Sequence, residues 1–277
     1  MPSNTDNPAP PIPRAQIHQP ASESKSQSRP GYRVAIFLTW LAGLVDAVGY
    51  LAYAKIYTAN MSGNSVALGI NLAQLRPTEI LLRSWPILLY VLGLLTGRLA
   101  IEIGARQKAP RIASVAFGFE ALLLGVAAWT GRGNPNPAEV NKILLGIALL
   151  ALAMGIQNAA LTRFSSLTLH TGFVTGTLVK FAEQFVRYCA KVYDDLSQQG
   201  SPARILARSV HERSFRISVL LALTWVAYVL GAIVGAYGSS RIHLRTLLIA
   251  IAGLVLLILL DQRAPLAIQE EKLQEQS

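Results

Sequence analysis

The residues best suited to chemistry in this sequence are small polar groups inside long apolar stretches. Asp46 is the first of them, and an ionised aspartate at the centre of a membrane-spanning helix costs roughly 2.5 to 3.5 kcal/mol. Such a residue must face a polar partner, water or the interior of a helical bundle. Asp46 can therefore be the group that changes charge in a proton or cation relay, or a hydrogen-bonded link between helices.

A polar turn follows Asp46 in the stretch "YTANMSGNS", which is apolar on both sides. Gly63 permits a tight backbone there, and Asn60, Ser62 and Asn64 have side chains that can cap the start of a short helix. A capped helix start inside a bundle directs free N–H groups and the positive end of the helix dipole at its neighbour. This turn can therefore bind an anion or a substrate carboxylate, unless it is an ordinary capped loop at the membrane surface.

A second copy of these features lies later in the chain. "GLVDA" at Gly43–Ala47 is repeated as "GIQNA" at Gly155–Ala159, which places an amide at the position equivalent to Asp46. A lone histidine beside the second polar turn can shuttle protons, although such a residue near a helix end is more often a hydrogen-bonded interface residue. The candidate binding residues of the second copy are Gln157, Asn158, His170, Thr171, Thr175, Gly176 and Thr177.

A third repeated motif contains closely spaced glycines. "YVLGLLTG" at Tyr90–Gly97 matches "YVLGAIVG" at Tyr228–Gly235, and three motifs in the same order indicate a duplication. Each copy has a GxxxG pair, which allows two helix backbones to approach closely. The residues expected at tight helix crossings are Gly93, Gly97, Gly231 and Gly235.

The composition defines the class of protein that must position these residues. The chain has 277 residues, of which 52% are hydrophobic and only 14% charged, and its mean hydropathy is +0.40. These values exclude an ordinary soluble domain and indicate a multi-pass membrane protein. The formal net charge of +10 is explained by basic loops beside anionic lipid, so membrane lipid is an expected partner and nucleic acid is not. The single cysteine, Cys189, excludes an internal disulfide and provides no metal cluster, and no cofactor is expected.

Apolar runs divide the chain into helices. Two short runs, at about 65–75 and 173–181, contain or adjoin polar residues, and the first would reach only roughly 16 Å as a helix. Short segments at matching places in two halves are typical of broken or re-entrant helices. The sequence therefore predicts an all-α polytopic bundle of two three-span repeats, each with one short helix. The six runs that reach or approach the roughly 20 residues of a membrane span lie at about 34–56, 82–103, 112–129, 143–162, 217–237 and 244–260.

An odd number of spans in each repeat gives the two repeats opposite orientations in the membrane. The basic segment 187–216 is then a cytoplasmic loop, and both termini are cytoplasmic. If both short helices cross the membrane instead, the chain has eight spans in two parallel repeats, and the loop charges do not decide between the two topologies. The expected divisions are a disordered Pro-rich tail at 1–30, repeat 1 at 31–130, a linker at 131–142, repeat 2 at 143–262 and a polar tail at 263–277.

The repeated motifs resemble those of the bacterial YoaK family, whose members are multi-pass membrane proteins with a domain of unknown function. The resemblance rests on "GLVDA", "ANMSGN", "GIQNA" and "TGFVTG" and covers roughly residues 32–260. Ser62 stands where the family favours threonine and keeps its hydroxyl, whereas Thr177 departs from the family's asparagine. The resemblance implies a helical protein of the bacterial inner membrane and supplies no substrate, cofactor or catalytic residue.

The duplicated polar turns favour a transporter of a small solute or an ion, with Asp46 as the coupling residue. The rival class is a non-transporting membrane scaffold or chaperone, in which the same turns only fasten helices together. An enzyme is not expected, because the sequence lacks the HExxH, GxSxG, P-loop and CxxC motifs, and no spacing supports a hydrolase formed by Ser62 or Ser65 with His170. The expected partners are membrane lipid and an unidentified solute or ion, and a homo-oligomer stays open.

Overall fold

The computed structural model of the chain describes residues 29–53, 55–107, 111–130, 140–161, 174–197, 205 and 208–263, and the regular structure in these ranges is entirely helical. The prediction of an all-α bundle is confirmed. In chain order the helices are α1 (Arg29–Ala52), α2 (Met61–Ala73), α3 (Pro77–Arg106), α4 (Ile112–Thr130), α5 (Val140–Leu161), α6 (Val174–Ser197), α8 (Arg213–Ile242), the 3₁₀ helix η1 (His243–Thr246) and α9 (Leu247–Arg263).

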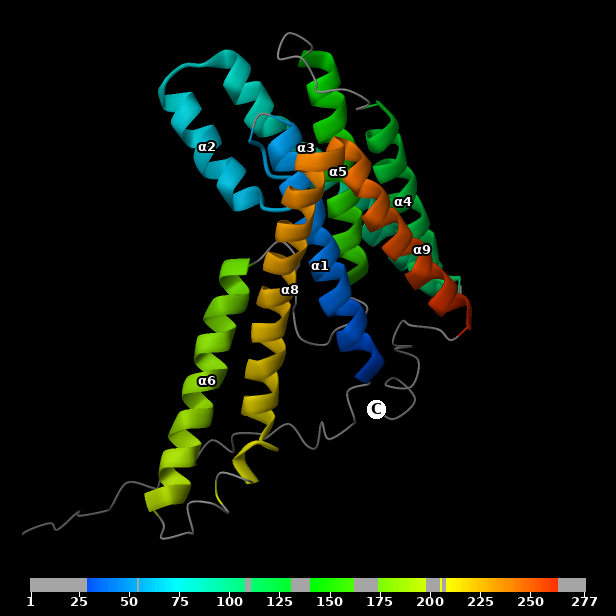
Figure 1. The fold of residues 1–277 in the computed structure, drawn as a ribbon. Helices are drawn as coiled ribbons and strands as arrows, with labels where there is room; N and C mark the ends of the chain where they lie inside the picture. Colours follow the sequence, from blue (N-terminus) through cyan, green and yellow to red (C-terminus); the bar gives the residue numbers. More distant parts are fainter. Residues whose placement is uncertain are drawn as a thin grey trace, which may run out of the picture.

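Most of these helices are long and apolar enough to cross a membrane. A helix pairs its own backbone N–H and C=O groups, as hydrocarbon requires. The longest qualifying stretch contains α8, η1 and α9, and the chain reverses at His243, whose φ is 52°. α1, α4 and α8 run in one direction along the bundle, and α3, α5 and α9 run in the other (Figure 1). The qualifying stretches are Gly31–Ala52, Pro77–Arg106, Ile112–Thr130, Val140–Leu161 and Arg213–Arg263.

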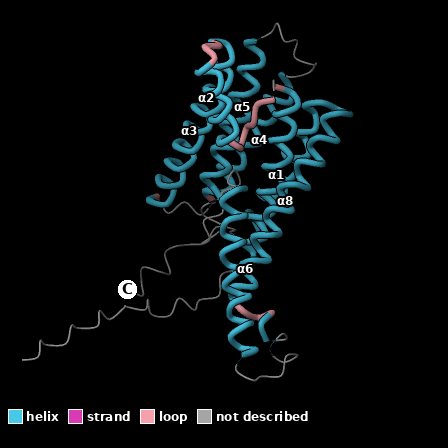
Figure 2. The backbone as a smooth tube through the Cα atoms, turned by 90° about the vertical axis from the view of Figure 1, so that its left-hand side faces the viewer, coloured by secondary structure: helices cyan, strands magenta, loops and turns pink. Residues whose placement is uncertain are grey.

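The helices pack in pairs that join the first half of the chain to the second. α1 packs against α8, α3 packs against α5, and α4 packs against both α9 and α5. Within each half, α2 packs on α3 and α6 packs on α8. Exchanging α1, α2, α3 and α4 for α5, α6, α8 and α9 preserves all of these pairs except α4–α5, whose counterpart is a smaller contact between α1 and α9. The two short-helix positions lie toward opposite ends of the bundle, with α2 at one end and α6 at the other (Figures 1 and 2).

Glycines bring α1 and α8 into close backbone contact. A Cβ atom on Gly43 would lie 2.1 Å from the carbonyl oxygen of Tyr228, and one on Gly231 would lie 1.9 Å from that of Trp40. A Cβ atom on Gly235 would lie 2.4 Å from the carbonyl oxygen of Leu44. Only glycine permits this approach, so α1 and α8 cross backbone to backbone.

The crossing of α3 and α5 has the same construction. A Cβ atom on Gly93 would lie 2.4 Å from the carbonyl oxygen of Leu152, and one on Gly155 would lie 2.3 Å from that of Tyr90. A Cβ atom on Gly97 would also be too close to α5. The GxxxG pairs of both motif copies therefore face a helix of the opposite half.

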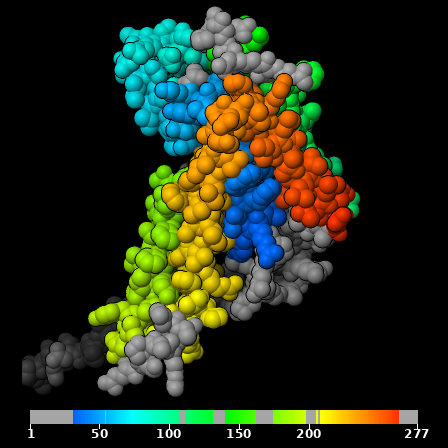
Figure 3. Space-filling view, viewed as in Figure 1, coloured from blue at the N-terminus to red at the C-terminus, as the bar shows by residue number. Residues whose placement is uncertain are grey.

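The second short helix predicted from the sequence is in fact long. α6 has 24 residues, and its last part, residues 187–197, falls within the segment expected to be a loop. Aromatic rings explain the helix, because Phe181, Phe185 and Tyr188 recur at helical spacing and form ring contacts that end on Phe215 of α8. The charged residues of this segment indicated a loop in the sequence. In the structure they belong to an amphipathic helix that packs along α8 (Figure 3).

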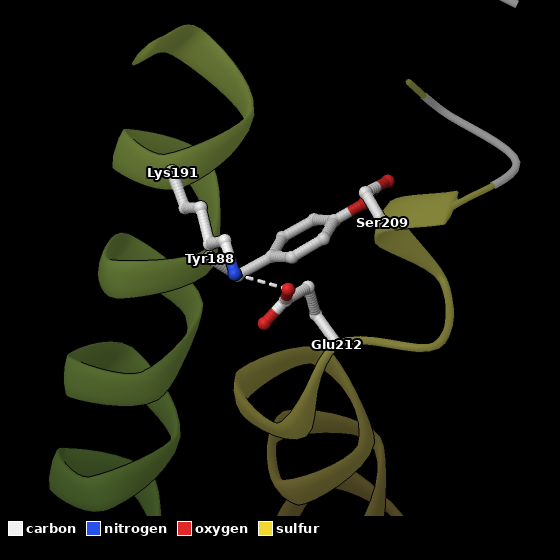
Figure 4. A network of polar contacts seen from close by, with 4 residues as sticks. All are labelled: Tyr188, Lys191, Ser209 and Glu212. Atoms are coloured by element: carbon white, nitrogen blue, oxygen red, sulfur yellow. Dashed lines mark hydrogen bonds and ion pairs between the residues drawn. The ribbon is translucent and has the colours of Figure 1, made fainter. Parts of the chain in front are cut away.

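The end of α6 is tied to the segment that precedes α8. The hydroxyl groups of Tyr188 and Ser209 are hydrogen bonded at 3.0 Å, and Lys191 forms an ion pair with Glu212 (Figure 4). Since α8 begins at Arg213, only part of the predicted loop at 187–216 is non-helical in the described residues. The predicted tails and linker lie almost wholly outside the described residues, at 1–28, 131–139 and 264–277.

Candidate functional site

The carboxylate of Asp46 lies at the centre of a buried hydrogen-bond network. Its Oδ1 atom accepts hydrogen bonds from the backbone N–H of Thr58 at 2.6 Å and of Ala59 at 2.8 Å. The Thr58 hydroxyl also donates to Oδ1 at 3.2 Å, and the Tyr228 hydroxyl donates to Oδ2 at 2.6 Å. Asp46 is only 2% exposed, so its four donors replace solvent. The network joins α1, the turn that follows it and α8.

The position of Asp46 near the end of α1 explains this network. Once the helix has ended, the N–H groups of Thr58 and Ala59 have no helical carbonyl to bind, and buried N–H groups need an acceptor. The chain turns back at residues 55–60, which brings both groups to the carboxylate. An acid inside the span therefore anchors the polar turn that follows it.

Asn64 holds the same turn from the other side. Its Nδ2 atom donates to the carbonyl oxygen of Tyr57 at 2.7 Å, and its Oδ1 atom accepts from the Tyr57 N–H at 3.2 Å. A Cβ atom on Gly63 would lie 3.0 Å from the ring of Tyr57, so glycine lets this ring pack on α2. The small polar residues of "YTANMSGNS" thus fix the turn between α1 and α2.

The side-chain cap predicted for α2 is absent. Asn60 occupies the N-cap position but its side chain makes no hydrogen bond to the helix backbone. Its Oδ1 atom instead accepts a hydrogen bond from the exposed Ser62 hydroxyl at 2.7 Å. The first N–H groups of α2 are therefore not capped by this side chain.

Asn158 forms a matching hydrogen bond in the second half. Its Nδ2 atom donates to the Tyr90 hydroxyl at 2.7 Å and to the carbonyl oxygen of Met154 at 3.2 Å, and the residue is 1% exposed. Tyr90 and Tyr228 occupy equivalent positions in the two "YVLG" motifs. The Asp46–Tyr228 and Asn158–Tyr90 pairs therefore match, and each crosses between the halves.

Gln157 is a further polar group within the bundle. Its Nε2 atom donates to the carbonyl oxygen of Leu38 at 3.2 Å, which links α5 to α1. The residue is fully buried, and within the described part of the chain its Oε1 atom has no hydrogen-bond partner. Gln157 and Asn158 thus lie beside each other in α5 but contact different helices.

The second polar turn is described only from the start of α6. Thr175 is exposed, Gly176 is half-buried and Thr177 is buried, whereas His170 and Thr171 lie outside the described residues. α2 packs on α3 and α6 packs on α8, and the described parts of these two short-helix elements form no principal helix pair with each other. The helix starts predicted to converge belong to two different helix pairs.

Two kinds of buried polar residue, a pair of tyrosines and a glutamate, were not among the candidates predicted from the sequence. Tyr90 and Tyr228 stand in the repeated "YVLG" motif, where a polar tip on an otherwise apolar helix signals a buried hydrogen bond. Glu120 is the sole charged residue of α4, and an acid in the middle of an apolar span is itself a signal of function. Glu120 is 1% exposed, and within the described part of the chain neither of its carboxyl oxygens has a hydrogen-bond partner.

Two tyrosines of the first polar turn lie outside the membrane spans. Burial raises the pKa of Tyr53 to about 12. Burial also raises the pKa of Tyr57, and Tyr50 and Asp46 add smaller contributions. Both phenols stay neutral at physiological pH. Among the described residues no three His, Cys, Asp or Glu side chains are grouped as metal ligands.

The fold and the buried polar pairs define a polytopic helical membrane protein with hydrogen bonds between its two halves. The chain belongs to the family described as Protein of unknown function (DUF1275), which it matches over residues 34–260. It is similar to the UPF0700 transmembrane protein YoaK of Bacillus subtilis (strain 168), with 26% identity over 202 residues, which cover 73% of this chain and 81% of that protein. The resemblance noted from the motifs is confirmed. No solved structure matches the chain.

Proposed function

We propose that this membrane protein transports a small solute or an ion and consists of two inverted three-span repeats. The observation that carries the proposal is the correspondence of the halves. Most of the packing pairs are preserved when the halves are exchanged, while equivalent spans run in opposite directions. Inverted repeats that pack through shared interfaces are typical of secondary transporters, in which one repeat moves against the other.

The proposed site lies between the halves, where the repeated motifs contribute polar groups. α2 begins at the turn of residues 60–64 and α6 begins near Thr175, and they extend toward opposite ends of the bundle. The first N–H groups of α2 lack a side-chain cap from Asn60, so they suit an anionic or carboxylate group of a solute. Gln157 contributes a buried acceptor without a protein partner in the described chain.

In this proposal Asp46 is a positioning residue. Its four donors already occupy the carboxylate, and they come from the turn and from the opposite half. A movement of α8 relative to α1 would break the hydrogen bond from Tyr228 and loosen the turn. Asp46 would thus couple the position of α8 to the start of α2 without touching the solute.

The proposed setting is the bacterial inner membrane, with both termini in the cytoplasm. Basic residues concentrate in the segment 187–216, which contains the end of α6 and the start of α8, and short basic segments stay on the cytoplasmic side of a membrane. The proposal assigns no enzymatic step to the protein.

A second candidate is a scaffold or membrane chaperone. The observation that favours it is that the side chains of Asp46 and Asn64 already form hydrogen bonds with other groups of the protein. In that case the polar turns contribute stability alone, and the halves do not move against each other.

Alternating access separates the two candidates without knowledge of the solute. Ser62 and Thr175 are exposed and equivalent in the two repeats, so single Ser62→Cys and Thr175→Cys variants are made in a Cys189→Ser background. A membrane-impermeant maleimide is applied to right-side-out and inside-out vesicles. A transporter exposes each cysteine to both faces in turn, so we expect labelling from either side.

The controls are Thr78→Cys and Ser197→Cys, which lie at the start of α3 and the end of α6 and should each react from one face only. Two-sided labelling of these controls would indicate leaky vesicles. If Ser62→Cys and Thr175→Cys are each labelled from a single face under all conditions, the transporter proposal fails and the scaffold is favoured.

A further inference from the structure

Glu120 is a buried acid that the site described above does not use. It lies near the midpoint of α4, a helix of 19 residues, and is therefore about 12 Å from the nearer helix end. The residue is 1% exposed, and its neighbours on the buried stripe of α4 include Phe117 and Leu124, which are fully buried and apolar. Glu120 is thus placed at the depth where hydrocarbon surrounds the protein.

The ionisable groups of the packed elements do not supply Glu120 with a partner. Lys142 lies at the start of α5, Asp261 and Arg263 lie at the end of α9, and the Ser114 hydroxyl donates to Asp261. On α3, the Tyr90 hydroxyl accepts a hydrogen bond from Asn158. The full set on the elements that pack on α4 is Lys142 on α5, Asp261 and Arg263 on α9, His243 and Arg245 on η1, and Glu79, Arg83, Tyr90, Arg98, Glu102 and Arg106 on α3.

The environment of Glu120 determines which form of the carboxyl group is present. An ionised carboxylate without donors in an apolar interior is very unfavourable, and such a group binds a proton instead. Asp46 is the contrast within the same protein, because four donors surround its carboxylate. The two buried acids therefore differ in chemical role, one as an acceptor in a fixed network and the other as a neutral acid.

We propose that Glu120 is a proton-binding site at the centre of the membrane, protonated in this conformation and able to release its proton when α4 separates from α5 or α9. This inference rests on the proposed transporter function and makes the proton its coupling ion. On release, the proton passes to water that enters between the helices, and the same water hydrates the carboxylate. The reverse movement returns a proton to Glu120 before the helices close.

The first test uses dicyclohexylcarbodiimide, an apolar reagent for protonated carboxyl groups in membranes. The carboxyl adds its O–H across one C=N bond of the reagent, and the resulting O-acylisourea rearranges to a stable N-acylurea without a leaving group. Wild-type protein in native membranes is treated across a pH series and analysed by mass spectrometry of its peptides. We expect an adduct on Glu120, with a rate that falls about tenfold per pH unit once the pH exceeds the midpoint of the site.

The control for reagent access is a Phe119→Glu substitution combined with Glu120→Gln. Phe119 is exposed on the outside of α4 at nearly the same depth, so the introduced carboxyl reports whether the reagent reaches this level of the bilayer. Labelling of this variant together with the absence of a Glu120 adduct in the wild type at every pH would overturn the proposal. An adduct on Asp46 in place of Glu120 would overturn it as well.

Infrared spectroscopy provides a second test. The wild-type spectrum minus that of Glu120→Gln should contain the carbonyl band of a protonated carboxyl group, and this band should convert to carboxylate bands as the pH rises. A carboxylate signal at all pH values, or a protonated band that never titrates, would refute proton exchange at Glu120. Because neither measurement requires transport, one-sided labelling at Ser62 and Thr175 would refute the transporter alone.

Discussion

At the scale of single residues, the two hydrogen-bonded pairs that join the halves, Asp46–Tyr228 and Asn158–Tyr90, differ in the group that bonds to the tyrosine hydroxyl. Tyr228 donates to a carboxylate, whereas Tyr90 accepts from the Asn158 amide. Hydrogen bonds to charged groups contribute more to stability than bonds between neutral groups. The pair formed by Asp46 should therefore hold its helices more strongly than the pair formed by Asn158.

The substitutions Tyr228→Phe and Tyr90→Phe test this difference. Each removes one hydroxyl and keeps the aromatic ring. We expect Tyr228→Phe to lower the free energy of unfolding by about 1.5 kcal/mol and Tyr90→Phe by about 0.6 kcal/mol. The free energies are measured by titrating purified protein in mixed detergent and denaturing surfactant. Equal losses would mean that the carboxylate does not strengthen its pair.

The sequence indicated the residues of these pairs only in part. Asp46, Gln157 and Asn158 could be predicted as buried and partnered, because polar groups inside apolar runs need partners. Their partners could not be predicted, since Tyr228 is far from Asp46 in the sequence and the pairing depends on which spans cross. Tertiary contact between the halves, rather than local pattern, defines the network.

At the scale of elements, the helix crossings depend on glycine at the contact. The crossing of α1 and α8 has the closest approach, because a Cβ atom on Gly231 would lie 1.9 Å from the carbonyl oxygen of Trp40. Backbone atoms cannot move aside as a flexible side chain can, so a methyl group there must separate the two helices. The separation would also lengthen the hydrogen bond from Tyr228 to Asp46.

Replacement of Gly231 by alanine should therefore destabilise the protein. We expect a loss of about 2 kcal/mol or more, measured in the same surfactant titration. Gly118→Ala is the matched control, because nothing lies within 4 Å of a Cβ atom at that position. This control should be neutral or slightly stabilising, since alanine favours a helix over glycine by about 1 kcal/mol. A similar loss in both variants would argue against close packing at Gly231.

The sequence predicted the long spans better than it predicted α6. Long apolar runs locate spans directly, and the runs at 82–103 and 112–129 became parts of α3 and α4. In α6 the charges Lys180 and Glu183 suggested that the short helix ends, and Arg187 was placed in the loop that follows. Glu183 and Arg187 instead form an ion pair of 2.7 Å on the surface of one continuous helix. The spacing of the aromatic residues, not the number of charges, carried the signal.

At the scale of the whole molecule, the directions of the helices predict where two distant positions lie. Thr78 stands at the start of α3 and Ser197 at the end of α6, and these helix ends lie toward opposite ends of the bundle (Figure 1). The packing of α1 on α8 and of α3 on α5 joins the two halves. A membrane normal along the bundle would place the two positions on opposite faces.

We expect single cysteines at Thr78 and Ser197, in a Cys189→Ser background, to react with an impermeant thiol reagent from opposite faces. In the proposed inverted repeat, three spans in the first half carry the chain to the other side before the second half begins. The measurement is labelling of intact and inverted vesicles. Labelling of both positions from the cytoplasmic face would support eight spans and two parallel repeats.

The crossings between halves also determine the order of events during synthesis. α1 enters the membrane before the later helices, but Tyr228, its partner in the Asp46 network, is made only after α2, α3, α4, α5 and α6. Throughout that interval Asp46 has an incomplete set of donors, and the surface of α1 at Gly43 is not yet covered by α8. The ribosome must therefore deliver nearly the whole chain before either half can reach its final state, because α1 waits for α8 and α4 waits for α9.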